Sequence, residues 1–168
     1  RDDHAFLLES VVGGERIARW SFIATSPSLV YECAAGESAI FSGMGPPKIA
    51  ESADPLHDLE KLLPKRRYHH APGLPNFTGG LVGYAGYDTI RYYEGEKLDH
   101  PPKDDRRLPD VSFGLYNELV VFDHVDKTIK VVANADLTRH PDVEFAYHDA
   151  SRRIDELVKR LSQPPVSK

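Results

Sequence analysis

The stretch from residue 6 to residue 25, FLLESVVGGERIARWSFIAT, decides the fold. Apolar side chains dominate both of its arms, and the pair Gly13 and Gly14 separates them. Glycine adopts the positive φ angles that tight hairpin turns require. The pattern therefore predicts two strands, over residues 5–11 and 16–25, which pair antiparallel as a hairpin.

The rest of the chain continues with short strands and single helices. Further strands are predicted over residues 28–34, 39–42, 77–87, 111–123 and 128–135. Helices are predicted to begin at Pro55 with Asp54 as the cap, at Thr89 with Asp88 as the cap, and at Pro141 or Asp142 with an end at Leu161. We expect the segment GMGPPK, after residue 42, to end regular structure and residues 95–109 to form an exposed excursion.

Hairpins predominate in this order of elements, and residues 124–127, HVDK, suit a hairpin turn. The helices arrive singly instead of alternating with the strands. These observations predict an α+β fold with two packed, largely antiparallel β-sheets and helices on the outside. A length of 168 residues with 40% hydrophobic residues suits one core, so we expect a single domain over residues 1–168.

The charge balance argues against several classes of partner. Lys and Arg number 21 against 26 Asp and Glu, and the acidic residues are spread along the chain. We therefore expect neither a nucleic-acid surface nor an anionic-membrane surface. No apolar run approaches the roughly 20 residues of a membrane span, and the single cysteine permits no internal disulfide. The sequence thus predicts a cytoplasmic protein, and its start without methionine and its proline-containing tail suggest a piece of a longer one.

The glycine-rich stretch TGGLVGYAGYD, residues 78–88, does not match a nucleotide site. It lacks the Lys followed by Ser or Thr of a phosphate-binding loop and the G-x-G start of a dinucleotide motif. We expect Gly80, Gly83 and Gly86 to permit close approach of a neighbouring backbone or ring. The 8 histidines are scattered and no nucleophile motif is present, so the sequence predicts neither a metal site nor a catalytic constellation.

Glu9 and Ser10 place an acid and a hydroxyl at the end of an apolar strand, with Arg19 across the hairpin. A free amino acid needs a negative group for its ammonium, a positive group for its carboxylate and an apolar slot for its side chain. Neighbouring side chains of a regular strand point to opposite faces, so both reach one ligand only at a strand end or bulge. From the residues alone, a cross-strand ion pair between Glu9 and Arg19 at the sheet rim is the favoured interpretation.

Three stretches in register resemble one known family. They are residues 6–25, quoted above, residues 74–94, LPNFTGGLVGYAGYDTIRYYE, and residues 117–133, NELVVFDHVDKTIKVVA. Together they resemble the N-terminal domain of anthranilate synthase component I, a chorismate-utilising enzyme, over nearly the whole chain. The family usually has glycine at the positions of Ala18 and Ala24, where the methyl groups would narrow a pocket.

The resemblance implies a partner domain and a partner subunit. In this family a larger C-terminal domain binds chorismate and magnesium, and a glutamine amidotransferase subunit supplies ammonia. The chain lacks that catalytic domain, so the resemblance implies a fragment of a lyase that is inactive alone and has no cofactor of its own.

The resemblance also implies a role for the polar residues of the hairpin. In the family the segment matching residues 7–10 forms part of the feedback site for L-tryptophan. Glu9 would meet the ammonium, Ser10 and Arg19 the carboxylate, and the indole would lie between the sheets, in at most half a pocket. Two alternatives stay open: the N-terminal domain of aminodeoxychorismate synthase, which more often has Asp before the serine, and a stand-alone amino-acid-binding module.

Overall fold

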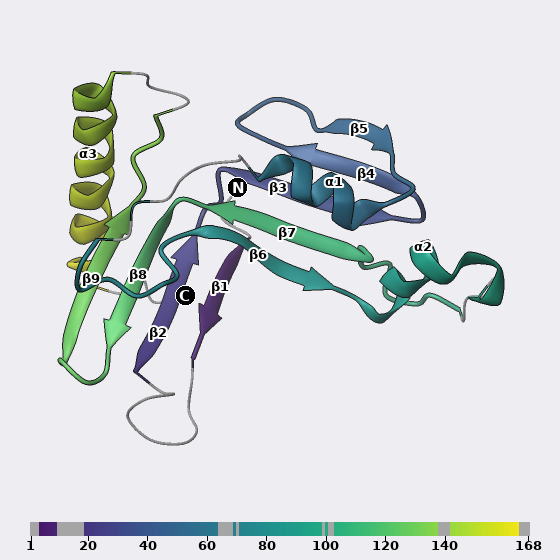
Figure 1. Cartoon of the computed structure of the whole chain (residues 1–168), viewed down its shortest axis with the longest axis horizontal. Coiled ribbons are helices and arrows are strands. Elements are labelled where there is room, and N and C mark those ends of the chain that lie inside the picture. The colour runs from purple at the N-terminus through teal and green to yellow at the C-terminus, as the bar shows by residue number, and fades with distance from the viewer. Residues whose placement is uncertain are drawn as a thin grey trace. The chain divides into compact units, whose positions relative to one another are not determined.

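The computed structural model describes residues 4–9, 19–63, 69, 71–98, 100, 103–137 and 142–164. Its contacts divide the chain into two compact units (Figure 1). The first unit comprises Arg1–Ser26, His70–Gly79 and Tyr116–Lys168, and the second comprises Pro27–His69 and Gly80–Leu115. Each unit is therefore assembled from segments far apart in the sequence, and the expectation of a single domain over residues 1–168 stays a prediction.

The first unit holds a four-stranded antiparallel sheet in the order β1-β2-β8-β9. Its strands are β1 (Ala5–Leu8), β2 (Trp20–Thr25), β8 (Glu118–Asp123) and β9 (Thr128–Ala133). The predicted pairing of the first two strands is confirmed, because Leu8 lies opposite Phe22. β1 ends before residue 11 and β2 begins after residue 16. The glycine pair between them lies outside the described residues.

Strand β8 is buried on both faces of this sheet. Leu119 and Val121 are 0% exposed, and Val120, which points to the opposite face, is 4% exposed. An aromatic cluster adds to the packing of the unit: the Phe77 ring lies 5.4 Å from the Phe22 ring and 6.4 Å from the Phe6 ring, centroid to centroid. Rings at these separations and tilted to one another stabilise beyond the area that they bury.

The long helix α3 (Val143–Leu161) packs on this sheet beside β9 (Figure 1). The predicted helix from Pro141 or Asp142 to Leu161 is confirmed, and its cap is Asp142, whose carboxylate accepts from the backbone N–H of Glu144 at 2.9 Å. Ala146, on the inward face of α3, is 0% exposed. Its small side chain lets the helix lie close to the strands.

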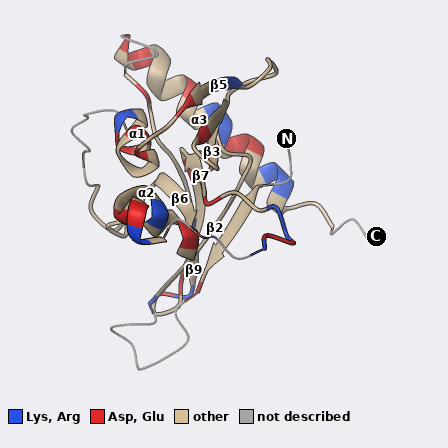
Figure 2. Ribbon diagram, turned by 90° about the vertical axis from the view of Figure 1, so that its right-hand side faces the viewer, with Lys and Arg blue, Asp and Glu red and all other residues tan. Residues whose placement is uncertain are grey.

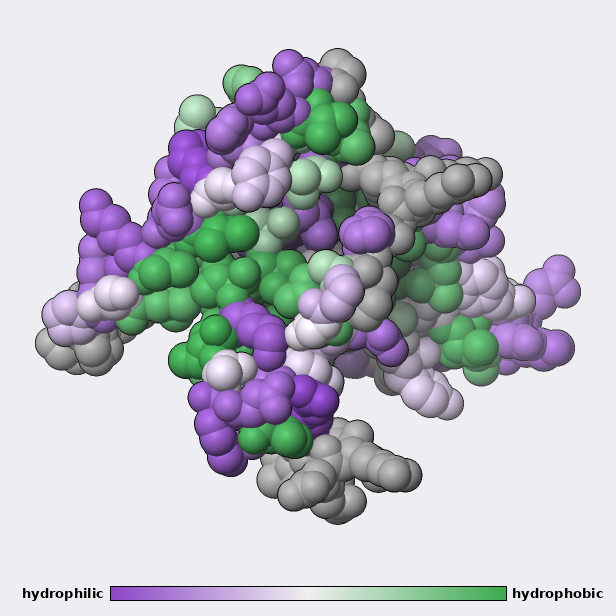
Figure 3. All heavy atoms as spheres, turned by 60° about the vertical axis from the view of Figure 1, so that its left-hand side comes forward, coloured by the Kyte–Doolittle hydropathy of each residue, from purple (hydrophilic) through white to green (hydrophobic). Residues whose placement is uncertain are grey.

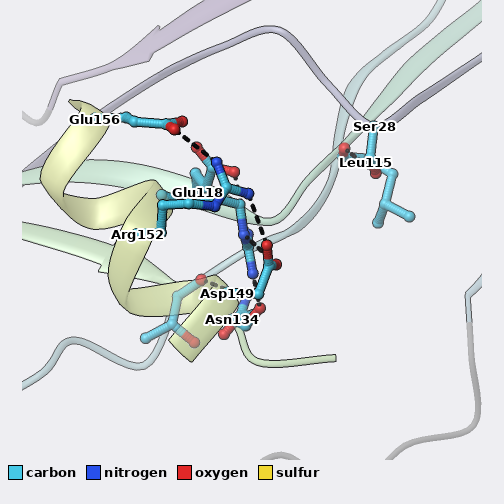
Figure 4. A network of polar contacts seen from close by, with 9 residues as sticks. Ser28, Leu115, Glu118, Asn134, Asp149, Arg152 and Glu156 are labelled. Atoms are coloured by element: carbon cyan, nitrogen blue, oxygen red, sulfur yellow. Dashed lines mark hydrogen bonds and ion pairs between the residues drawn. The ribbon is translucent and has the colours of Figure 1, made fainter. Parts of the chain in front are cut away.

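The cation Arg153 on α3 ties the helix to the sheet, and its partners Glu118, Asn134 and Asp149 are labelled in Figure 4. Arg153 donates to Glu118 Oε1 at 3.1 Å and to the Asn134 carbonyl at 2.8 Å. It also pairs with Asp149 on its own helix at 2.9 Å. The Arg153 side chain is only 18% exposed, so these contacts are better shielded from water than a surface pair.

The second unit holds a five-stranded sheet in the order β5-β4-β3-β7-β6. Its strands are β3 (Leu29–Ala34), β4 (Glu37–Phe41), β5 (Lys48–Glu51), β6 (Gly80–Ala85) and β7 (Val111–Tyr116, with Tyr116 counted in the first unit). Helix α1 (Pro55–Leu62) begins with the predicted cap, since Asp54 accepts from the His57 N–H at 3.0 Å. Leu59 of this helix completes a core with Tyr31, Cys33 and Val111. The α+β class with two antiparallel sheets is confirmed.

Three predictions about the elements are wrong in detail. Regular structure does not end after residue 42, because β5 pairs with β4 as an edge strand. The run 111–123 is two strands in two different sheets, since the ladder breaks at Asn117. A continuous apolar run does not reveal where the chain leaves one sheet for another.

The third difference concerns the short helical segment. It begins at Tyr87 as a single 3-10 turn, η1 (Tyr87–Ile90), followed by α2 (Arg91–Glu94) and η2 (Gly95–Leu98). Asp88 lies inside that turn and pairs with Arg91 at 2.6 Å, so it is not a cap. The residue at the cap position is Gly86, and no side chain caps this turn.

Gly83 confirms the predicted close approach of strands. A Cβ at this position would lie 2.0 Å from the Ser112 carbonyl oxygen and 2.6 Å from Phe113 Cα. Both atoms belong to β7, so β6 and β7 pair this closely only because residue 83 has no side chain.

Replacing Gly83 by Ala should destabilise the protein by about 3 kcal/mol, because overpacking against backbone forces the strands apart. Urea denaturation followed by circular dichroism measures the change. Gly45→Ala is the matched control, since its Cβ would have nothing within 4 Å. Equal denaturation midpoints for the two variants would contradict the close packing of β6 on β7.

Candidate functional site

Two of the three predicted site residues, Glu9 and Arg19, lie at one end of the paired strands β1 and β2. Glu9 directly follows β1, and Arg19 directly precedes β2. Because Leu8 lies opposite Phe22, the two residues flank the same end of the paired strands. Glu9 is exposed, and Ser10 lies outside the described residues.

Arg19 is bound by a partner that the sequence did not reveal. Its Nε donates to Asp123 Oδ1 at 3.1 Å and its Nη2 to Asp123 Oδ2 at 2.8 Å, a bidentate pair. Nη2 also donates to Asp126 Oδ2 at 2.8 Å. The expected cross-strand pair with Glu9 is therefore wrong: within the described part of the chain, Arg19 pairs with acids of the β8–β9 turn.

Asp123 is the centre of this cluster. Its side chain is 0% exposed, and Lys130 Nζ donates to its Oδ2 at 3.0 Å. The backbone N–H groups of Val125 and Asp126 donate to Oδ1, both at 3.1 Å. The hydrogen bond from Arg19 is the main cause that holds the pKa of Asp123 well below its usual range, against the opposing effect of burial.

The sequence predicted a hairpin turn over residues 124–127, and the backbone N–H groups that donate to Asp123 belong to that turn. The ion pairs of Asp123 were missed. The signal in the sequence was an acid that ends the apolar strand ELVVFD, and the structure places this acid opposite Trp20. An acid at the buried end of a strand needs a cation, and the sequence offers no way to choose which one.

Trp20 completes the cluster with its ring. Arg19 Cζ lies 4.5 Å and Lys130 Nζ 5.0 Å from the ring centroid, both within range of a cation–π interaction. The Arg19 guanidinium is thus held by two acids and one aromatic face. The hydrogen bond that Arg19 donates to Asp123 is the main cause that raises the pKa of Arg19, so this side chain stays charged.

Ser21 and His124 make a second contact at the same end of the sheet. Ser21 Oγ lies 2.7 Å from His124 Nε2. The backbone N–H of His124 donates to the backbone carbonyl oxygen of Arg19 at 2.8 Å. Ser21 is only 4% exposed, so the pair joins β2 to the turn after β8 and offers no accessible nucleophile.

A pocket of about 250 Å³ opens at the opposite end of β2, against α3. It is lined by Ile23, Ala24, Thr25, Ser26, Glu118, Val120, Leu157, Arg160 and Leu161. Figure 3 presents one face of the molecule, on which exposed hydrophobic side chains (green) gather beside hydrophilic ones. Neither Glu9 nor Arg19 lines this pocket, so it is separate from the predicted effector site.

The charges and donor sets limit what the described residues can do. Figure 2 shows both signs of charge on helices α1, α2 and α3. Within the described part of the chain, no group of three or more His, Cys, Asp or Glu residues is placed to hold a metal ion. No described helix is both long enough and apolar enough to cross a membrane.

Comparison with known proteins identifies the family. Residues 3–167 match the family model described as chorismate binding enzyme, so this chain belongs to the chorismate-binding enzyme family. Within it, the chain is homologous to anthranilate synthase component I, which confirms the resemblance carried by the three stretches.

The relatives are far longer than this chain. Anthranilate synthase component 1 of Acinetobacter calcoaceticus is 36% identical over 163 residues, covering 95% of this chain and 32% of the relative. The chloroplastic anthranilate synthase alpha subunit 1 of Oryza sativa subsp. japonica is 34% identical over 168 residues, covering 96% and 29%. The crystal structure of anthranilate synthase component I from Streptococcus pneumoniae TIGR4 matches with a TM-score of 0.70 at 25% identity, covering 94% of this chain and 32% of that one.

Replacing Asp123 by Asn should lower the melting temperature at pH 7, because Arg19 and Lys130 lose their shared counter-charge. The pKa of Asp123 is lowered in the folded state, so its contribution is fully present above the unfolded carboxyl pKa of about 4 and declines as pH falls below that value. The difference in melting temperature from wild type should therefore be constant from pH 8 to 5 and shrink below about pH 4.

Thermal denaturation followed by circular dichroism across this pH range is the measurement. Asp155→Asn, at an exposed position of α3, controls for the loss of one negative charge. A difference between Asp123→Asn and wild type that grew below pH 4 would show that the cause lies elsewhere.

Proposed function

We propose that this chain is the N-terminal, tryptophan-sensing regulatory region of an anthranilate synthase component I. The parent enzyme would convert chorismate and glutamine-derived ammonia to anthranilate in tryptophan biosynthesis. The chain spans about a third of its relatives' length. The catalytic chemistry and its magnesium are therefore assigned to a chorismate-binding domain outside this chain, and ammonia to a glutamine amidotransferase subunit. We place the protein in the cytoplasm, although the rice relative is chloroplastic by name.

The observation that carries the sensing role is the position of Glu9 and Arg19 at the same end of the β1–β2 hairpin. The exposed Glu9 carboxylate suits the ammonium group of an amino acid, and the Arg19 guanidinium suits its carboxylate. Ser10, the next residue after Glu9, adds a hydroxyl. Leu7 and Leu8 before them are 54% and 46% exposed, so apolar surface for an indole lies next to the polar groups.

The alternative functions have less support. The relatives that we compared are anthranilate synthases by name, and Glu9 stands where aminodeoxychorismate synthases more often have Asp. A stand-alone amino-acid-binding module is disfavoured because the matched relatives are about three times longer. Product analysis decides between the first two, since anthranilate and its 4-amino isomer are separable by chromatography.

In the intact protein, L-tryptophan should inhibit anthranilate formation from chorismate and ammonia. Glu9→Gln should weaken that inhibition about tenfold or more, because a charge-assisted hydrogen bond to the ammonium is lost. Ser10→Ala should weaken it by a smaller factor. The measurement is the tryptophan concentration that halves the initial rate.

Glu51→Gln, at an exposed position of β5, serves as the charge-matched control and should leave inhibition unchanged. Indole-3-propionate lacks the ammonium group, so its weaker effect should not respond to Glu9→Gln. Unchanged inhibition by tryptophan in both Glu9→Gln and Ser10→Ala would remove the sensing role.

A further inference from the structure

We propose that Asp123 and Asp126 set the affinity of Arg19 for the effector's carboxylate in opposite directions. Asp123 is a positioning residue that holds the guanidinium in place, and Asp126 is a competing carboxylate that occupies the edge of the guanidinium which a ligand would use. This inference rests on the proposed function, because it takes Arg19 as the residue that meets the carboxylate of tryptophan.

The positioning role follows from how completely Asp123 is fixed. Its carboxylate is 0% exposed and accepts from Arg19, Lys130 and the backbone of its own turn. The bidentate contact uses the Nε–Nη2 edge of Arg19. With one edge bound to a fixed acid and the ring of Trp20 4.5 Å from Cζ, the guanidinium has little freedom to rotate. The adjacent edge, formed by Nη1 and Nη2, is therefore presented in a fixed direction.

The competing role of Asp126 follows from which Arg19 hydrogens remain once Asp123 is bound. Nη2 carries two hydrogens, and the contacts with Asp123 and Asp126 account for both. A two-point contact with an effector carboxylate through the Nη1–Nη2 edge requires the Nη2 hydrogen that Asp126 holds. The Asp126 side chain is 56% exposed, so it can turn into water at little cost.

The charge balance of the cluster also supports the competing role of Asp126. Arg19 and Lys130 are balanced by Asp123 and Asp126, so the four side chains sum to zero. When Asp126 turns away, the remaining three carry one positive charge beside Trp20. An incoming carboxylate restores the balance, which makes the exchange of one carboxylate for another electrostatically even. Asp126 thus occupies the place on Arg19 that the carboxylate of the ligand would take.

Calorimetric titration of the intact protein with L-tryptophan tests both roles. Asp126→Ala should tighten binding about twofold to fivefold, the range expected from an exposed ion pair. Asp123→Asn should weaken it about tenfold or more, because Arg19 loses its buried counter-charge and its orientation. Asp155→Ala on the exposed face of α3 controls for the removed charge and should leave the affinity unchanged.

Tryptamine, which lacks the carboxylate, separates positioning from general damage to the fold. Its affinity should not change in Asp126→Ala or Asp123→Asn, since neither aspartate acts on the indole or the ammonium. An equal loss of affinity for tryptamine and tryptophan in Asp123→Asn would assign that residue a purely structural role and overturn its part in the inference.

The outcomes distinguish this inference from the function on which it rests. If wild-type protein does not bind tryptophan, the proposed function fails and the inference fails with it. If wild type binds and Glu9→Gln weakens binding, while Asp126→Ala binds as wild type or more weakly, the inference is overturned and the sensing role stands. Should Asp123→Asn fail to fold, the Asp126→Ala result decides by the same criterion.

Discussion

The four-stranded sheet depends on the ion pair between Arg19 and Asp123. A carboxylate with no exposure is costly unless cations and N–H groups satisfy it, and Asp123 is satisfied from three directions. Arg19 precedes β2, Lys130 belongs to β9, and the N–H groups come from the turn that joins β8 to β9. One carboxylate therefore fixes the ends of three neighbouring strands and places Trp20 opposite itself.

A second ion pair holds the other end of the same strand. Glu118, the first residue of β8, pairs with Arg153 of α3, and Asp123, the last residue of β8, pairs with Arg19. Between them the side chains of Leu119 and Val121 are fully buried. β8 is thus an apolar strand closed by an acid at each end, one attaching the helix and the other shaping the hairpin end where Glu9 lies. The guanidinium that we assign to the effector is a structural part of this sheet before it is a ligand contact.

The sequence predicted those features that depend on residues close together in the chain. The cap Asp54 was predicted because an acid ahead of an apolar repeat satisfies the first N–H groups of a helix. The close approach at Gly83 was predicted because a strand glycine has few other uses. Strand β5 was missed, since KIAE is a short edge strand without an alternating pattern and its pairing with β4 defines it. The division of residues 111–123 was missed because both halves are equally strand-like and only their partners differ.

The sequence by itself determined the family, the α+β class, the helix cap Asp54, the pairing of the first two strands, and the polar residues Glu9 and Arg19 that follow and precede them. Only the tertiary structure decided what Arg19 binds. Its partner Asp123 lies 104 residues away, and Glu9 stands much nearer along the chain. Propensity and capping act over a few residues, whereas the register of β2 on β8 is settled by packing across the whole sheet. That register, and not the nearness of residues in the chain, selects the acid that receives the cation.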